Sequence, residues 1–290
     1  MVANITRKVD AGESLSEADL TELLAPHQLI SLMTLADRVR RRRHGTRTTF
    51  VRVQQVSGSG PLPPRASGAG ELQIVGAPPT VDSALARIEE TLAIAGEVPV
   101  SAFELSDLDR LAAGAGLSLR TLLERLREAG LELVADAAVD RLPKKEAAIE
   151  AVNMAGLILA RASLTSGPGH PPIESLRQVA DLQRSVGVLR TFRPLPRRID
   201  PERPTTGYAD IREVALARLL VDNVEMIQVD WTLYGPKLAQ VALAAGADDV
   251  DQVPALEPPR EGRAGAAEVR GNVEAAGFTP AERNGRFDER

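Results

Sequence analysis

The sequence contains no cysteine and only three histidines among its 290 residues. The absence of thiols excludes disulfides, thiol nucleophiles and every zinc or iron–sulfur site that is built on cysteine. Three histidines supply little material for a metal site built on imidazole. We therefore expect no metal site in this chain.

Aromatic residues are scarce as well, with one Trp, two Tyr and five Phe. So few rings argue against a surface that stacks nucleic-acid bases, and the net charge of −5 argues against broad nucleic-acid affinity. No run of about 18 apolar residues is present, so we expect no membrane span. The N-terminus lacks the apolar segment and cleavage site of a secretory signal, which favours a cytoplasmic protein.

What the sequence does contain is an alternation of strand-like and helical segments. The strand-like segments are Thr48–Val56, Glu71–Val75, Val98–Phe103, Leu131–Ala135, Leu157–Leu164, Val186–Phe192 and Met226–Trp231, with a weaker eighth at Asp249–Val253. Repeated alternation with helices predicts parallel strands joined by right-handed crossovers, and eight such strands close a barrel. No Gly-rich fingerprint follows the first strand, which disfavours an open doubly wound sheet. We predict an α/β fold, a modified or incomplete (β/α)8 TIM-like barrel with N-terminal helices and a C-terminal helix.

Three regions follow from this pattern. Residues 1–45 form an N-terminal helical extension, where Ser14 and Glu17 are spaced as in a capping box. Residues 46–253 form the barrel. Residues 254–290 form a flexible linker followed by one last helix, because EPPREGRAG precedes AAEVRGNVEAAG.

The connection between the first two strands is abnormal. The fourteen residues Ser57–Gly70 include three prolines and four glycines, which cannot form an amphipathic crossover helix. We expect this segment to be irregular and mobile. We also expect its missing helix to uncover apolar residues of the helix Thr80–Ala95, namely Val81, Leu85, Ile88, Leu92 and Ile94. A second copy of the chain or an active relative would then cover that flank, unless the Pro-rich loop or the N-terminal helix folds over it.

Several long stretches carry a family resemblance. GPKLAQVALAAGADDVD, RPTTGYADIREVALARLLVDN and LADRVRRRRHGTRTTFV resemble the radical SAM enzymes of the futalosine route to menaquinone, chiefly aminofutalosine synthase. Dehypoxanthine futalosine cyclase and the deazaflavin (FO) synthases are close relatives of that enzyme. The likeness continues through ELQIVG, ADLQRSVGVLRTFRPLP and the tail VRGNVEAAGFTPAERNGRF, and it follows the same order along almost the whole chain.

The resemblance implies a cofactor that this chain lacks the ligands to hold. In the family, the first strand leads into a CxxxCxxC loop whose thiolates hold a 4Fe–4S cluster, and the cluster binds and cleaves S-adenosylmethionine. Here Arg52–Gly70 stands in place of that loop, and no cysteine elsewhere can substitute. Relatives also carry a GGGAE turn where this chain has ADAAVD, so side chains occupy space that the glycines leave open. We expect neither cluster nor S-adenosylmethionine chemistry.

Four residues are candidates for a ligand site. His170 follows a predicted strand and matches a Gly-His pair of the family, although an exposed loop histidine is an equal alternative. Gln228 and Asp230 share one face of a strand, and a polar face in a barrel strand often points into the lumen. Arg193 ends the preceding strand and could reach Asp230, more often as a structural than as a catalytic ion pair.

Two other polar clusters have bland alternatives. The run Arg38–Arg43 could bind phosphate, but it also ends a helix, where cations complement the dipole. Asp248, Asp249 and Asp251 suggest a divalent cation, but three carboxylates without a further ligand do not define such a site.

The leading functional hypothesis is a cluster-less paralogue of aminofutalosine synthase, a non-radical partner or regulator in menaquinone biosynthesis that pairs with an active relative. The alternative is a barrel that binds a nucleoside or an aromatic acid, with or without non-radical catalysis. Pocket-facing polar residues favour the alternative, whereas a filled barrel end and an apolar outer patch favour the partner.

Overall fold

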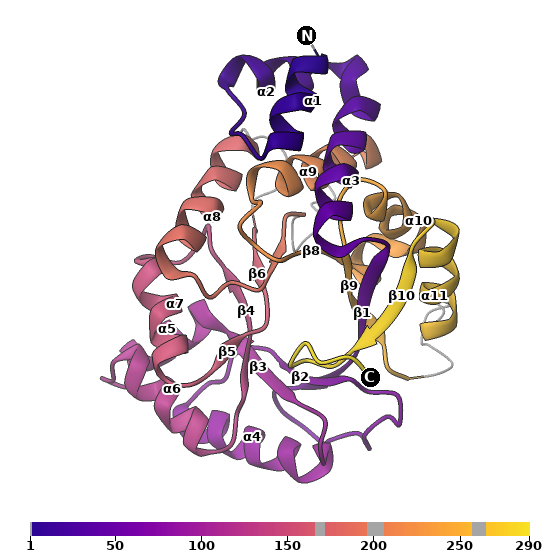
Figure 1. Cartoon of the computed structure of the whole chain (residues 1–290). Coiled ribbons are helices and arrows are strands. Elements are labelled where there is room, and N and C mark those ends of the chain that lie inside the picture. Colours follow the sequence, from indigo (N-terminus) through magenta and orange to yellow (C-terminus); the bar gives the residue numbers. More distant parts are fainter. Residues whose placement is uncertain (1, 166–171, 196–205, 257–264) are drawn as a thin grey trace.

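The computed structural model describes residues 2–165, 172–195, 206–256 and 265–290 as a parallel barrel (Figure 1). Its strands are β1 (Arg47–Ser57), β2 (Glu71–Val75), β3 (Val100–Glu104), β4 (Leu133–Ala138), β5 (Ile158–Leu159), β6 (Ala162–Ser163), β7 (Thr191–Arg193), β8 (Met226–Asp230), β9 (Asp249–Pro254) and β10 (Thr279–Arg283). β5 and β6 both pair with β4 and together occupy one strand position of the barrel. The last of the eight positions, β9, pairs with the first, β1. The barrel of eight parallel strand positions is therefore closed. This confirms the predicted fold class and shows that the barrel is complete, not incomplete.

Helices cover the outside of the barrel. They are α4 (Val81–Ala95), α5 (Leu105–Gly114), α6 (Leu119–Glu128), α7 (Lys145–Met154), α8 (Pro172–Val186), α9 (Gly207–Leu220) and α10 (Trp231–Leu243). Each of them lies between strands in the chain, as right-handed crossovers require. Within the described part of the chain, no helix combines the length and the apolar character needed to span a bilayer.

The N-terminal extension consists of α1 (Val2–Ala11), α2 (Glu17–Leu23), a 3-10 turn (Pro26–Gln28) and α3 (Leu29–His44). The capping box of α2 is formed by Ser16 and Asp19, so the expected Ser14–Glu17 pair is wrong by two residues. Asp19 accepts hydrogen bonds from Lys8 Nζ at 2.5 Å and from the Ser16 amide at 2.8 Å. These bonds lower the pKa of Asp19 to about 2 and tie α1 to α2.

The basic run at the end of α3 serves the fold in two places. Arg40 is fully buried and donates to the carbonyls of Ala247, Gly45 and Arg47. Arg42 donates to the last carbonyls of α1, at Val9 and Asp10. These contacts support the structural interpretation of the run, because the guanidiniums satisfy carbonyls that would otherwise lack donors.

The connection between β1 and β2 is irregular, as expected, and contains no helix. It is fastened to β1 by hydrogen bonds: Gln54 Nε2 donates to the Pro64 carbonyl at 3.0 Å, and Gln54 Oε1 accepts from the Ala66 amide at 2.7 Å. Ala66 and Ala69 are buried. The expected mobility of this segment stays a prediction.

The expected apolar patch on α4 is wrong. Ile88 is fully buried, and the other four apolar side chains of that helix are half-buried against the core (Val81, Leu85, Leu92 and Ile94). Arg87 of α4 faces the connection between β1 and β2. Its side chain is buried there and donates to the carbonyls of Ser57 and Gly60. The Pro-rich loop thus folds against α4, as the rival expectation stated.

The C-terminal region adds more than a helix. After α11 (Ala266–Ala275), β10 runs parallel to the first half of β1, with Arg47 opposite Thr279. β2 pairs with the second half of β1, from Val53 onward. β10 therefore fills the edge of β1 that β2 leaves open near the amino end of the barrel, and this strand was not anticipated from the sequence.

Candidate ligand site in the barrel lumen

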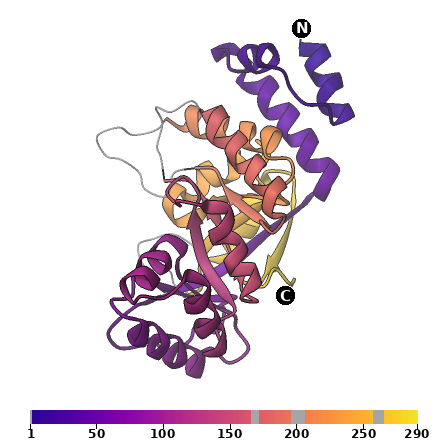
Figure 2. The same cartoon turned by 90° about the vertical axis from the view of Figure 1, so that its left-hand side faces the viewer.

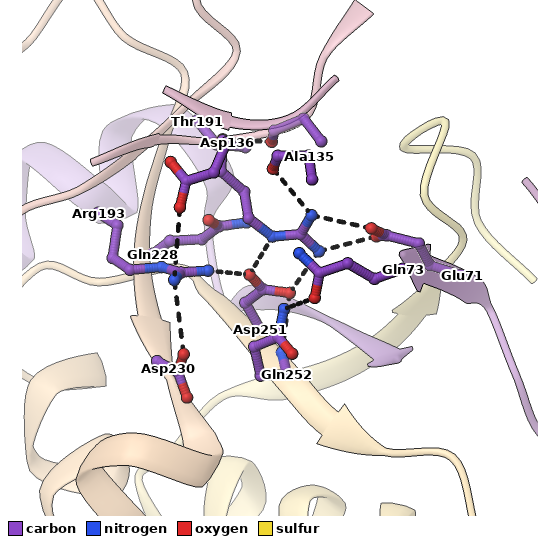
Figure 3. Close-up of polar contacts among 12 residues, drawn as sticks. Glu71, Gln73, Ala135, Asp136, Thr191, Arg193, Gln228, Asp230, Asp251 and Gln252 are labelled. Carbon is purple, nitrogen blue, oxygen red and sulfur yellow. Dashed lines mark hydrogen bonds and ion pairs between the residues drawn. The ribbon is translucent and has the colours of Figure 1, made fainter. Parts of the chain in front are cut away.

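Polar side chains converge inside the barrel because successive residues of a strand point to opposite faces. The lumen is thus lined by alternate positions that carry charged or amide groups. These are Glu71 and Gln73 on β2, Gln228 and Asp230 on β8, Asp249 and Asp251 on β9, and Arg193 on β7, and all are buried. Figure 3 shows most of them pointing toward one another across the lumen.

Arg161 lies at the centre of this network, at the break between β5 and β6. Its guanidinium donates to both oxygens of Glu71 at 2.8 Å and to both oxygens of Asp251 at 2.5 and 3.0 Å. The fifth N–H bonds the Ala135 carbonyl at 3.3 Å, so every donor of the group is used. Burial lowers the pKa of Arg161, but Asp251 and Glu71 outweigh it, and the pKa lies well above its ordinary value.

Arg193 is held less completely. It bonds Asp251, and its Nη1 lies 3.5 Å from Asp230 and 4.0 Å from Asp136. Its Nε is buried and has no hydrogen-bond partner among the described residues. The predicted Arg193–Asp230 pair is therefore present, and it has spare hydrogen-bonding capacity.

Asp230 ends β8 and also begins α10. One of its oxygens accepts from the Leu233 amide at 2.8 Å, as an N-cap does. Burial raises the pKa of Asp230, and the nearby charge of Arg193 opposes that shift. A carboxyl group of this kind takes up a proton more readily than an exposed one.

A second layer lies nearer the amino end of the barrel. Arg283 of β10 donates to both oxygens of Asp249 at 2.7 Å, and Thr49 and Gln228 donate to the same carboxylate at 2.5 and 2.8 Å. The Oε1 atom of Gln228 is buried without a hydrogen-bond partner in the described part of the chain. The layer is thus satisfied except at that one acceptor.

Three amides form a line at the carboxyl end of the barrel. Gln55 of β1 donates to Gln252 at 2.9 Å, and Gln252 donates to Gln73 at 2.9 Å. Gln252 has a φ of 56°, a left-handed conformation that is rare outside glycine. This conformation places Gln252 in the lumen directly after Asp251, where regular alternation would turn it outward. We call Gln55, Gln252 and Gln73 the glutamine line.

Only some of the residues predicted from the sequence for a ligand site lie close together in the structure. Gln228, Arg193 and Asp230 lie together, whereas His170 lies outside the described residues. The three aspartates of the ADDVD segment do not converge on a cation site. Asp248 pairs with Arg218 at 2.6 Å and His44 at 3.0 Å, and no cluster of metal-ligating side chains occurs in the described ranges.

Sequence reasoning missed the residues that organise the network. The sequence does contain a pattern that could have identified Arg161. A lone arginine interrupts the apolar run LILARASL, and a buried cation implies buried carboxylates beside it. Arg283 had none, because its strand was not anticipated. Glu71 falls in a predicted strand, but the sequence alone predicts no role for it.

The residues in place of the family's cluster loop do not fit an iron–sulfur cluster. The segment after β1 offers serine hydroxyls, backbone carbonyls and Arg65, and no thiolate or imidazole. A cluster of that type requires thiolate ligands. Ala135, Ala137 and Val139, at the position where the resemblance implies a glycine-rich turn, are each less than a tenth exposed.

Comparisons with known proteins agree with the resemblance. The sequence profile of the CofH/MqnC C-terminal region matches residues 194–290. Cyclic dehypoxanthine futalosine synthase of Streptomyces coelicolor is 28% identical over 67% of this chain and 56% of its own length. Aminodeoxyfutalosine synthase of Thermus thermophilus is 28% identical over 85% of this chain and 82% of its own. The chain thus spans little more than half of the first relative.

Solved structures share the fold. Methylornithine synthase (PylB) superposes with a TM-score of 0.67 at 16% identity, covering 95% of this chain and 97% of that one. The FeFe-hydrogenase maturase HydG of Carboxydothermus hydrogenoformans gives 0.69 at 15% identity, covering 97% and 79%. At such low identity these matches establish the barrel architecture alone.

Proposed function

We propose that this chain is a divergent, non-radical relative of aminodeoxyfutalosine synthase and cyclic dehypoxanthine futalosine synthase, both of which it resembles in sequence, and that it binds a small molecule in its lumen. The observation that carries the proposal is the pair of orphaned polar atoms on Arg193 and Gln228, both deep in the lumen. Buried polar groups are almost always paired, so an orphaned donor beside an orphaned acceptor implies a further partner.

The chemistry of the donor set supports the non-radical part of the proposal. No thiolate is available to ligate an iron–sulfur cluster that could reduce S-adenosylmethionine, and the connection after β1 is packed on Gln54 and Arg87. The barrel keeps its closed form without that machinery. A role as a ligand-dependent regulator within or beside the menaquinone route would need only the barrel.

A second candidate is a partner of an active synthase of the same family. The expected patch on α4 does not support it, since that helix is covered. The N-terminal helices do, because α1 and α2 stand away from the barrel (Figure 2), and Ile30 at the start of α3 is 72% exposed. A protruding helical extension with an exposed apolar residue at the start of α3 is the kind of surface that contacts another chain.

Two measurements test these functions. Native mass spectrometry of the protein purified from its host should show a bound small molecule that denaturation releases. Light scattering with a host aminodeoxyfutalosine synthase should detect a complex if the partner role holds. A monomer that carries no ligand and forms no complex with the synthase would contradict both candidate functions.

The non-radical assignment has its own test. Anaerobic reconstitution with iron and sulfide should give no stoichiometric cluster, and incubation with S-adenosylmethionine and dithionite should release no 5′-deoxyadenosine. The physical reason is the absence of any thiolate to ligate iron. An active cysteine-bearing relative serves as the positive control, and turnover by this chain would refute the assignment.

A further inference from the structure

A groove lies where the N-terminal extension meets the barrel. It has a volume of about 500 Å³ and is bounded by α1, α3, α8 and α9 (Figure 1). α3 and α9 contribute residues near their C-terminal ends, and these ends lead to the amino ends of β1 and β8. Barrels of this kind bind ligands at the carboxyl ends of their strands. The groove is therefore separate from the candidate site in the lumen.

The lining of the groove combines apolar side chains with four guanidiniums. The apolar side chains come from both the extension and the barrel, namely Val9, Leu15, Val39, Leu219 and Leu220. The guanidiniums are those of Arg42 and Arg43 on α3 and of Arg177 and Arg184 on α8. A ligand that matches this lining has an apolar body and carries negative charge.

Two of the four guanidiniums have no carboxylate that neutralises them. Arg42 donates to the last carbonyls of α1 at 2.7 and 2.8 Å, and these groups carry no net charge. Within the described ranges, the exposed side chain of Arg43 forms no hydrogen bond and no ion pair. Glu13 also lines the groove, but its carboxylate pairs with Arg7 at 2.9 Å. Arg42 and Arg43 thus leave two positive charges uncompensated at one end of the groove.

The two arginines of α8 are held only weakly. Arg177 pairs with Glu17, and Arg184 pairs with Asp181. Both carboxylates are exposed, by 74% and 62% of their side-chain surface. Exposed pairs of this kind contribute under about 1 kcal/mol. An anion in the groove can therefore compete for these guanidiniums as well.

Arg43 also acts on a buried cation of α9. Burial lowers the pKa of the Arg218 guanidinium, Asp248 opposes that shift, and the positive charge of Arg43 adds to it. Asp222, which lines the groove, opposes Arg43 less strongly. An anion beside Arg43 would relieve the repulsion between the two guanidiniums. This contribution favours anion binding independently of the pairs on α8.

We propose that this groove binds a small soluble phosphate monoester with an apolar body, whose phosphate contacts Arg42 and Arg43 and whose body packs on Leu219 and Leu220. A phosphate monoester carries nearly two negative charges at neutral pH, which matches the two guanidiniums that have no carboxylate partner. The volume of about 500 Å³ lies within the range of small-molecule sites. The inference goes beyond ligand binding in the lumen, because it assigns a second site.

Calorimetry and ligand-observed NMR with three matched probes test the proposal. Hexyl phosphate carries both parts of the ligand, inorganic phosphate only the anion, and 1-hexanol only the apolar body. We expect hexyl phosphate to bind about tenfold or more tightly than either of the others, and to weaken as the salt concentration rises.

Three results would overturn the proposal. One is no binding of hexyl phosphate, and another is equal affinity for hexyl and inorganic phosphate, which would indicate a bare anion contact. The third is binding to vesicles of phosphatidic acid without binding of hexyl phosphate, which would indicate a lipid surface. None of them bears on the ligand of the lumen, which is measured separately in the host-purified protein.

Variants on α3 provide the matched control. Arg43→Gln should weaken hexyl phosphate binding about tenfold, as the loss of a charged hydrogen bond predicts. Arg38→Gln removes the same charge from the same helix, but Arg38 lies outside the groove and pairs with Asp10, so affinity should change less than about twofold. Equal losses in the two variants would reduce the effect to net charge and contradict the site.

Leu220→Ala tests the apolar part of the groove. It should weaken the binding of hexyl phosphate and leave that of inorganic phosphate unchanged, because only the apolar body contacts this side chain. An equal loss for both probes would contradict the assigned orientation of the ligand. Arg43 is exposed, so its variant remains decisive if Leu220→Ala does not fold.

Discussion

The lumen around Arg161 and the lumen around Arg193 are built from the same residue types, but the two guanidiniums differ in how completely they are hydrogen-bonded. All five donors of Arg161 are bonded to Glu71, Asp251 and Ala135, whereas Arg193 keeps an unpaired Nε and longer contacts to Asp230 and Asp136. A fully satisfied buried guanidinium holds strands together, while an incompletely satisfied one can still accept a ligand. The comparison separates a structural arginine from a candidate binding arginine without reference to their sequence context.

The largest expected effect is at Arg161. Arg161→Met should destabilise the fold by about 3–5 kcal/mol, because Glu71 and Asp251 would lose their buried counter-charge. Denaturant unfolding measures this change. Arg110→Met is the control, since its pair with Asp107 is exposed on the arginine side and should contribute under about 1 kcal/mol. A loss at Arg161 as small as that of the control would refute its structural role.

A smaller loss is expected at Arg193. Arg193→Met should cost about 1–3 kcal/mol, because Asp251 keeps Arg161 and the raised pKa of Asp230 lets that carboxyl accept a proton. The same variant should abolish ligand binding. Denaturant unfolding measures the first effect, and native mass spectrometry of the host-purified variant measures the loss of the bound small molecule. Comparable destabilisation by both arginine variants would remove the contrast between the two regions.

Glu213 on α9 is a further charged group whose burial is not compensated, because its neighbour Asp210 is also an acid. Burial, with the nearby charge of Asp210, raises the pKa of Glu213 to about 7 from an ordinary value of 4.5. The folded state therefore holds a proton that the unfolded state releases between these values, so stability should fall as pH rises through that window.

Glu213→Gln should abolish this pH dependence and stabilise the protein by about 1 kcal/mol at pH 8, a figure discounted because the residue is only partly buried. The gain should disappear below pH 4.5, where the Glu213 carboxyl is protonated in both the folded and the unfolded state. Thermal unfolding across this range, with the exposed Glu89→Gln as control, measures it. A gain that does not change with pH would show that burial of charge is not its cause.

The sequence predicted the barrel well because its strands and helices are separated by distinct periodicities. β2 was located to the residue, and β8 within one residue, since apolar runs bounded by turns leave little freedom. The resemblance to the family and the irregular connection after β1 were also readable, because the quoted sequence stretches and the clustered prolines and glycines are visible in the sequence alone.

What escaped prediction depends on contacts between distant segments. The attachment of the Pro-rich connection to α4 involves Arg87 donating to the carbonyl of Ser57, which no local pattern encodes. The role of Arg161 depends on Glu71 and Asp251, each 90 residues away along the chain. Strand β10 has a short and partly exposed sequence, TPAER, whose pairing with β1 makes it a strand.

The pairing of β10 with β1 also has a kinetic consequence. Residues 47 and 279 become neighbours only when nearly the whole chain is available, so this contact has a very high sequence separation. Topologies dominated by such contacts fold slowly. Pairing of β9 with β1 can close the barrel without β10. Until β10 is in place, however, Asp249 lacks the guanidinium of Arg283, so a closed barrel can still hold an unneutralised carboxylate.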